Sequence, residues 1–183
     1  MSPFKRILYL IFTVVTAVAS QAQSKNSPRL KQFEDHVAAY LKLRKTVTSQ
    51  IPQLKPTASA QDLAAVRVQL ASGLAKARAS ATQGTLFTPD VANEFRRLGK
   101  LAINGRDGKR VEKSLKNSEP VKGMVEVNQS YPPGVPLQTM PPTLLQALPH
   151  LPKELEYRLV DRTLLVLDSE AQLIIDYLPE AIP

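Results

Sequence analysis

The hydrophobic periodicity of this 183-residue chain changes once, near residues 118–123. Before this point apolar residues recur every three or four positions, as in amphipathic helices, and after it they alternate, as in strands. Ten of the 15 prolines lie at or after Pro120, and proline breaks both helices and sheet ladders. The charge changes at the same place, because residues 23–122 carry a net charge of +11 and residues 123–183 a net charge of −5. These coincident changes predict an α+β protein.

Three amphipathic helices are predicted in the basic region. Each begins with a residue type that caps helices: Ser27 precedes a proline, Ser59 lies three residues before Asp62, and Thr88 precedes Pro89. Their apolar stripes predict the core, and consist of Leu30, Phe33, Val37, Tyr40, Val47 and Ile51; of Leu63, Val66, Leu70, Leu74 and Ala77; and of Val91, Phe95, Leu98 and Ala102.

Two further features complete the predicted helical region. Arg44 interrupts the first apolar stripe, and Lys109–Leu115 predicts a short fourth helix. Three or four helices joined by linkers of roughly six to ten residues are typical of a small bundle. We therefore expect residues 23–122 to form a basic helical bundle.

A proline-rich crossover is predicted over residues 123–152. Within it, Met124–Val127 predicts a strand, and Tyr131–Pro136 holds too many prolines for regular structure. Pro141–Leu148 predicts one or two helical turns, after which prolines interrupt the chain again. The Tyr131–Pro136 segment is expected to lie extended across the surface.

Residues 153–183 predict a three-stranded antiparallel β-meander. Leu155, Tyr157 and Leu159 alternate with charged residues, which indicates a strand with one buried face. A turn at Asp161-Arg162 leads to an apolar run, and a second turn leads to the strand Leu173–Tyr177. A small sheet needs cover on its apolar face, so we expect the helices to pack on it within one domain.

Three segments of the meander carry a family resemblance: Leu151–Val160, Leu165–Asp168 and Ile174–Tyr177. Together they resemble the closing module of uncharacterised exported bacterial proteins. They are similar, more loosely, to the C-terminal module of periplasmic proteins of the nickel- and cobalt-homeostasis family. In that pattern a Leu-Pro pair enters a Tyr-Arg strand, an aspartate ends the second strand, and a third strand rich in valine or isoleucine follows.

The resemblance implies a meander fold in a protein outside the cytoplasm. For the metal-linked members it also implies metal handling. Those members carry histidine-rich stretches, whereas this chain has only His36 and His150, and it has Asp161-Arg162 where that family often has a glycine.

The first 22 residues have the order of parts of a secretory signal peptide. Lys5 and Arg6 precede the apolar stretch Ile7–Val15, and Ser20–Ala22 supplies small residues before a cleavage point. Cleavage is expected after Ala22 or after Ala19. The uncharged stretch is 16 residues long, shorter than the roughly 20 of a bilayer span, so retention as an anchor is the second alternative. We expect a protein exported to the periplasm or the extracellular space, without a membrane span after cleavage.

Several chemistries are missing from the sequence. The chain has no cysteine, which excludes disulfides, thiolate zinc sites and cysteine nucleophiles. It has no nucleophile elbow, phosphate loop or dinucleotide-binding glycine pattern. We interpret Asp168 and Glu170 as turn residues and Asp176 as an alternating strand residue, rather than as a catalytic carboxylate cluster. The sequence therefore predicts no enzyme, no metal site and no cofactor.

Basic residues concentrate between positions 96 and 116 and predict the binding site. They are Arg96, Arg97, Lys100, Arg106, Lys109, Arg110, Lys113 and Lys116, of which the first seven form the predicted site. Such a density of charge attracts polyanions. The predicted export makes an anionic envelope component or an acidic protein the expected partner and excludes intracellular nucleic acid. Two alternatives are a solvated helix face and internal docking of the basic half onto the acidic half.

Two other functions remain as alternatives to this non-enzymatic binding protein. One is a weak metal-handling periplasmic protein, as the looser resemblance implies. The other is a hydrolase in which His150 acts with a nearby carboxylate. That hydrolase requires His150 to lie within hydrogen-bond reach of an acid in a concave pocket.

Overall fold

The computed structural model describes residues 27–52, 59–105, 108–109, 113, 125–131 and 140–183. In chain order its elements are α2 (Pro28–Thr48), α3 (Ala60–Ala77), α4 (Pro89–Asn104), α6 (Pro142–Ala147), β1 (Leu155–Val160), β2 (Thr163–Asp168) and β3 (Leu173–Leu178). Helices precede an antiparallel sheet, which confirms the predicted α+β class. The predicted signal peptide, residues 1–22, lies outside the described residues. Among the residues that the structure describes, no helix is long and apolar enough to cross a bilayer.

The sheet is the predicted meander, with strand order β1-β2-β3 and both pairs antiparallel. The turns depend on residues with positive φ, Asp161 at 55° and Gln172 at 52°. A bulge interrupts the second pair, because Val166 pairs with Asp176 whereas Leu167 pairs with Ile174. Ile175 is therefore an extra residue, and the bulge changes which side chains of β3 face the helices.

The predicted strand Met124–Val127 is wrong where the structure describes it. Val125–Val127 forms no strand, and the next residues pair with the sheet instead. The amide of Asn128 donates to the carbonyl of Ile174 over 2.9 Å, and that of Tyr131 donates to the carbonyl of Gln172 over 2.8 Å. This segment therefore lies along the outer edge of β3.

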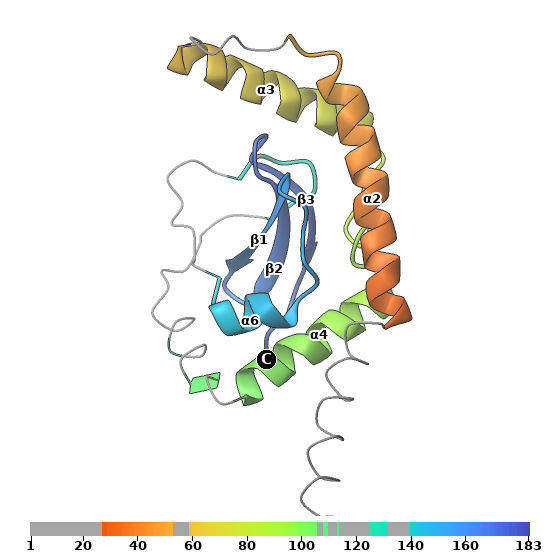
Figure 1. The fold of residues 1–183 in the computed structure, drawn as a ribbon, viewed down its shortest axis with the longest axis vertical. Coiled ribbons are helices and arrows are strands. Elements are labelled where there is room, and N and C mark those ends of the chain that lie inside the picture. Colours follow the sequence, from red (N-terminus) through yellow and green to blue (C-terminus); the bar gives the residue numbers. More distant parts are fainter. Residues whose placement is uncertain (1–26, 53–58, 106–107, 110–112, 114–124, 132–139) are drawn as a thin grey trace, which may run out of the picture.

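The helices frame the sheet (Figure 1): α2 runs along one side of it, α3 crosses one end, and α4 and α6 lie at the other end. The main core joins the apolar stripes of α2 and α4 to one face of the sheet, through residues such as Phe33, Phe95, Tyr157 and Ile175. A smaller cluster on the other face contains Leu165, Leu167 and Tyr131. Both faces of β2 are consequently buried.

The helix boundaries follow the predicted caps. The predicted capping box is present at Ser59 and Asp62, whereas Ser27 and Thr88 make no side-chain cap bond. The predicted stripe of α3 is buried only in its second half, at Leu70 and Leu74, and Leu63 is 56% exposed. The reason is geometric, because the second half of α3 packs against α2 and the first half extends away from α2 (Figure 1).

Glycines allow two close helix contacts. A Cβ on Gly73 of α3 would lie 2.8 Å from a methyl carbon of Val47 on α2. A Cβ on Gly99 of α4 would lie 2.4 Å from the carbonyl oxygen of Ala181. The C-terminal segment is further held by the amide of Ala181, which donates to the carbonyl of Arg162 over 2.9 Å. Gly99 thus lets α4 pack directly on the backbone of the last residues.

We predict that Gly99→Ala lowers the free energy of unfolding by about 1–3 kcal/mol, because the new methyl group forces α4 and the C-terminal segment apart. At an open helix position the same change stabilises by up to about 1 kcal/mol. Urea unfolding measures the difference. Ser72→Ala, at an exposed position of α3, is the control and should cause no loss. Stabilisation by Gly99→Ala would contradict the contact.

Candidate functional site

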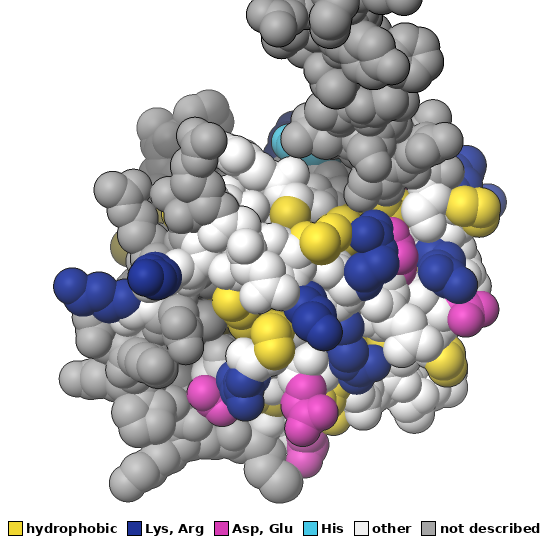
Figure 2. All heavy atoms as spheres, turned by 90° about the horizontal axis from the view of Figure 1, so that it is seen from below, with side chains coloured by type: hydrophobic (Ala, Val, Ile, Leu, Met, Phe, Trp, Pro, Cys, Tyr) yellow, Lys and Arg dark blue, Asp and Glu magenta, His cyan; other side chains and the backbone are white. Residues whose placement is uncertain are grey.

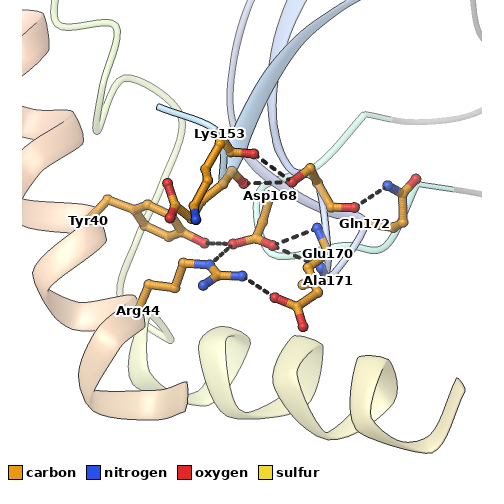
Figure 3. Close-up of polar contacts among 9 residues, drawn as sticks. Tyr40, Arg44, Lys153, Asp168, Glu170, Ala171 and Gln172 are labelled. Atoms are coloured by element: carbon orange, nitrogen blue, oxygen red, sulfur yellow. Dashed lines mark hydrogen bonds and ion pairs between the residues drawn. The ribbon is translucent and has the colours of Figure 1, made fainter. Parts of the chain in front are cut away.

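Asp168, at the end of β2, is the first of two buried carboxylates that connect the helices to the sheet. Its side chain is 0% exposed. Its Oδ2 accepts hydrogen bonds from the hydroxyl of Tyr40 over 2.8 Å and from Nε of Arg44 over 2.6 Å. Its Oδ1 accepts from the backbone amides of Glu170 and Ala171. Figure 3 shows the two α2 side chains pointing at this carboxylate from one side and the turn closing on it from the other.

The interruption of the first apolar stripe is thereby explained. Arg44 lies on the buried side of α2 because it pairs with Asp168 through Nε and with Glu170 through Nη2, each over 2.6 Å. Burial raises the pKa of Tyr40, and the charge and hydrogen bond of Asp168 raise it further. Tyr40 therefore remains a protonated donor to Asp168.

Asp176, on β3, is the second buried carboxylate and is also 0% exposed. Its Oδ2 accepts from the amides of Leu86 and Phe87 over 2.6 and 2.9 Å, and its Oδ1 accepts from the amide of Gly84 over 3.0 Å. The bulge at Ile175 places this aspartate on the helix side of the sheet. Asp176 thus holds the loop between α3 and α4 through its backbone.

Arg78, directly after α3, joins the two carboxylate sites. Its guanidinium lies 5.4 Å from the centre of the Tyr40 ring. Nη2 donates to the carbonyl of Ile175 over 2.8 Å and Nη1 to Oδ1 of Asn128 over 2.7 Å. Through these contacts Arg78 connects α2, the end of α3 and the sheet within one buried polar network.

The predicted basic site is on α4 and just after it. Arg96, Arg97 and Lys100 are exposed on α4, and Lys109 and Lys113 are exposed further along the chain. Arg106 and Arg110 lie outside the described residues. Figure 2 views this end of the molecule and shows Lys and Arg side chains gathered across the middle of the face, with Asp and Glu side chains beside them.

Two of these residues also make contacts within the protein. Arg97 binds both carboxylate oxygens of Glu94, over 2.7 and 3.0 Å, and Nη2 of Arg96 donates to the carbonyl of Pro179 over 3.2 Å. Glu94 is buried on α4, and Nη1 of Arg29 on α2 lies 3.9 Å from its Oε2. The hydrogen bonds from Arg97 lower the pKa of Glu94. Arg29 therefore extends the basic face from α4 onto the first turn of α2.

The structure places the two histidines in different surroundings. Nδ1 of half-buried His36 lies 3.4 Å from the carbonyl oxygen of Leu86. His150 is exposed and lines a cavity of about 690 Å³ between α2, α6 and β1. Within the described part of the chain His150 makes no ion pair with a carboxylate, and no group of three or more His, Cys, Asp or Glu side chains is arranged to hold a metal ion.

Comparison of the chain with protein-family models, curated proteins and solved structures found no match. The functional argument therefore depends on the described surfaces themselves. These are the basic face of α4, with Arg29, and the cavity beside His150. The sequence indicated the basic face through its density of Lys and Arg, but gave no sign of the cavity, whose walls come from three separate elements.

We predict that Asp176→Ala lowers the free energy of unfolding by about 3 kcal/mol or more, because three loop amides lose their acceptor inside the protein. Asp176→Asn keeps one acceptor oxygen and should lose less. Asp35→Ala, which removes an exposed acid of α2, is the control and should change stability by no more than about 0.5 kcal/mol. Urea unfolding measures all three. Equal effects of Asp176→Ala and the control would contradict the anchoring role.

The Glu94–Arg97 pair predicts a pH dependence of stability. Because the folded-state pKa of Glu94 is lowered, its stabilisation is fully present above the ordinary glutamate pKa and is lost as the pH falls through the lowered value. The variant Arg97→Met removes the main cause of the lowered pKa of Glu94. We expect this variant to be less stable than the wild type at neutral pH and to lose less further stability as the pH falls. Urea unfolding at neutral pH and across the acid range measures both differences. Arg96→Met, next to it, should leave the pH dependence unchanged; equal profiles for wild type and Arg97→Met would refute the linkage.

Proposed function

We propose that this protein is an exported, non-enzymatic binding protein that holds an anionic polymer or an acidic partner on the basic face of α4. The observation that carries the proposal is the exposure of Arg96 and Lys100 one turn apart on α4, with Lys109 and Lys113 also exposed beyond it. Arg29 adds a further charge from α2.

The competing explanation for the basic region is internal docking onto the acidic half of the chain. The acids on the helix side of the sheet, Asp168 and Asp176, are already occupied, by Arg44 and Tyr40 and by loop amides. None of their described partners comes from the 96–116 segment. The charges of Arg96 and Lys100 therefore remain available for a ligand outside the protein.

The shape of the face favours an extended ligand over a small one. The described basic side chains of α4 are exposed on the surface of a helix, so each can meet a different charge of a chain or a surface. Several such contacts act together by releasing counterions, which makes binding strong at low salt and weak at high salt.

We predict that the triple variant Arg96→Glu, Lys100→Glu and Lys109→Glu loses retention on immobilised heparin. For three lost contacts the slope of log affinity against log salt should fall by about 2 to 3, since each contact to a linear polyanion contributes about 0.9. Arg97 is left intact because its removal would leave buried Glu94 without its partner. Salt-gradient elution and titration at several salt concentrations measure the change.

The matched control reverses three exposed charges at the other end of the molecule, Lys45, Arg67 and Lys76 on α2 and α3. It has the same net charge as the test variant and should keep most of the retention. Equal weakening by both variants would show that net charge alone attracts heparin, and the proposed site on α4 would then be wrong. Anionic vesicles in place of heparin distinguish a lipid surface from a soluble polymer.

A further inference from the structure

The cavity beside His150 has the composition of a small-molecule site. Its volume is about 690 Å³, and most of its walls are apolar. Leu30 comes from α2, Leu145 and Leu148 come from α6, and Tyr157 comes from β1. An apolar cleft of several hundred cubic ångströms with few polar groups is the usual form of a ligand pocket.

The charged groups of this cavity carry more negative than positive charge. Among the described residues that line it, two are carboxylates, Glu34 and Glu156, and one is a cation, Arg158. Nη2 of Arg158 donates to Oε2 of Glu156 over 2.6 Å, so these two charges compensate each other. His150 contributes no charge in its neutral form. Glu34 makes no ion pair within the described part of the chain.

The negative charge of Glu34 reaches into the cavity. The pKa of Tyr157 is raised well above its usual value, mainly by burial and in addition by the charge of Glu34. The hydroxyl of Tyr157 donates to the carbonyl of Pro149 over 3.1 Å, which fixes its ring as part of the wall. The cavity is therefore locally negative within a protein whose net charge is +8.

We propose that this cavity binds a small amphipathic cation, with its apolar body against Leu145, Leu148 and Tyr157 and its ammonium group beside Glu34. Burial of the apolar body supplies the binding free energy. The unpaired carboxylate selects the charge of the ligand. This site is separate from the basic face of α4 and takes a ligand of the opposite sign, so it stands or fails independently of the function proposed above.

The test uses three probes with the same six-carbon chain: hexylammonium, 1-hexanol and hexanoate. Each is titrated into the ¹⁵N-labelled protein, and backbone amide shifts are followed by NMR. We expect hexylammonium to shift the amide signals of Glu34, Leu148 and Tyr157. It should bind about fivefold more tightly than 1-hexanol, because one partly exposed charge contact contributes about that factor in affinity. Hexanoate should bind most weakly.

Two variants test the charge selection. Glu34→Gln should bring the affinity for hexylammonium down to that for 1-hexanol, and His150→Lys should weaken hexylammonium by adding a positive charge to the wall. Both positions are exposed, so neither change removes core packing. Asp35→Asn is the matched control, because Asp35 is also an exposed acid of α2 but bonds to Lys31 and does not line the cavity. It should leave hexylammonium binding unchanged.

Three results would overturn the proposal. Hexanoate binding as tightly as hexylammonium would assign the cavity to anionic ligands. Unchanged selectivity in Glu34→Gln would remove the role of this carboxylate. Hexylammonium shifts confined to residues outside the cavity would place any cation site elsewhere on the protein.

Discussion

Two carboxylates that face inward from a small sheet hold this fold together. Asp168 and Asp176 are fully buried, and such charges are tolerated only when hydrogen bonds replace the lost water. Asp168 receives its bonds from α2, and Asp176 receives its bonds from the loop that leads to α4. The chain has no disulfide to fix these elements. Apolar burial supplies the bulk of the driving force, whereas the two aspartates specify where the helices meet the sheet.

The fold class was predictable because it depends on local patterns. The meander follows from alternation in β1 and from turns at Asp161 and beyond, and the capping box at Ser59 fixes the start of α3. These signals involve residues a few positions apart, and no distant contact overrides them. The apolar stripe of α3 is an exception and shows the limit of prediction from local patterns. Periodicity indicates which face of a helix is apolar but not how far a neighbouring helix extends along that face, so Leu63 fits the pattern and is nevertheless exposed.

The polar contacts between distant segments were not predictable. Asp168 has the residue type and position of an ordinary turn aspartate, and its partner Arg44 lies 124 positions away in sequence. The interruption of the apolar stripe by Arg44 was the one available signal, and a buried arginine requires a buried acid, but the sequence offers several acids. The contacts of Asp176 were even harder to predict. Only the bulge at Ile175 turns it toward the helices, and a bulge leaves no mark in the alternation of a six-residue strand.

The two proposed binding surfaces differ in how salt should act on them, because only the cavity adds apolar contacts to its charge contact. The basic face of α4 is open to solvent, so ions screen it over its whole length. Glu34 is also exposed, but the proposed cation contacts the apolar walls of the cavity as well, and salt does not screen apolar contacts. At low salt the positive protein as a whole also repels a small cation on its approach. Added salt therefore weakens the attraction at α4 and this long-range repulsion together, while the apolar contacts in the cavity persist. A single chain could in this way release a polyanion and retain a small cation under the same conditions.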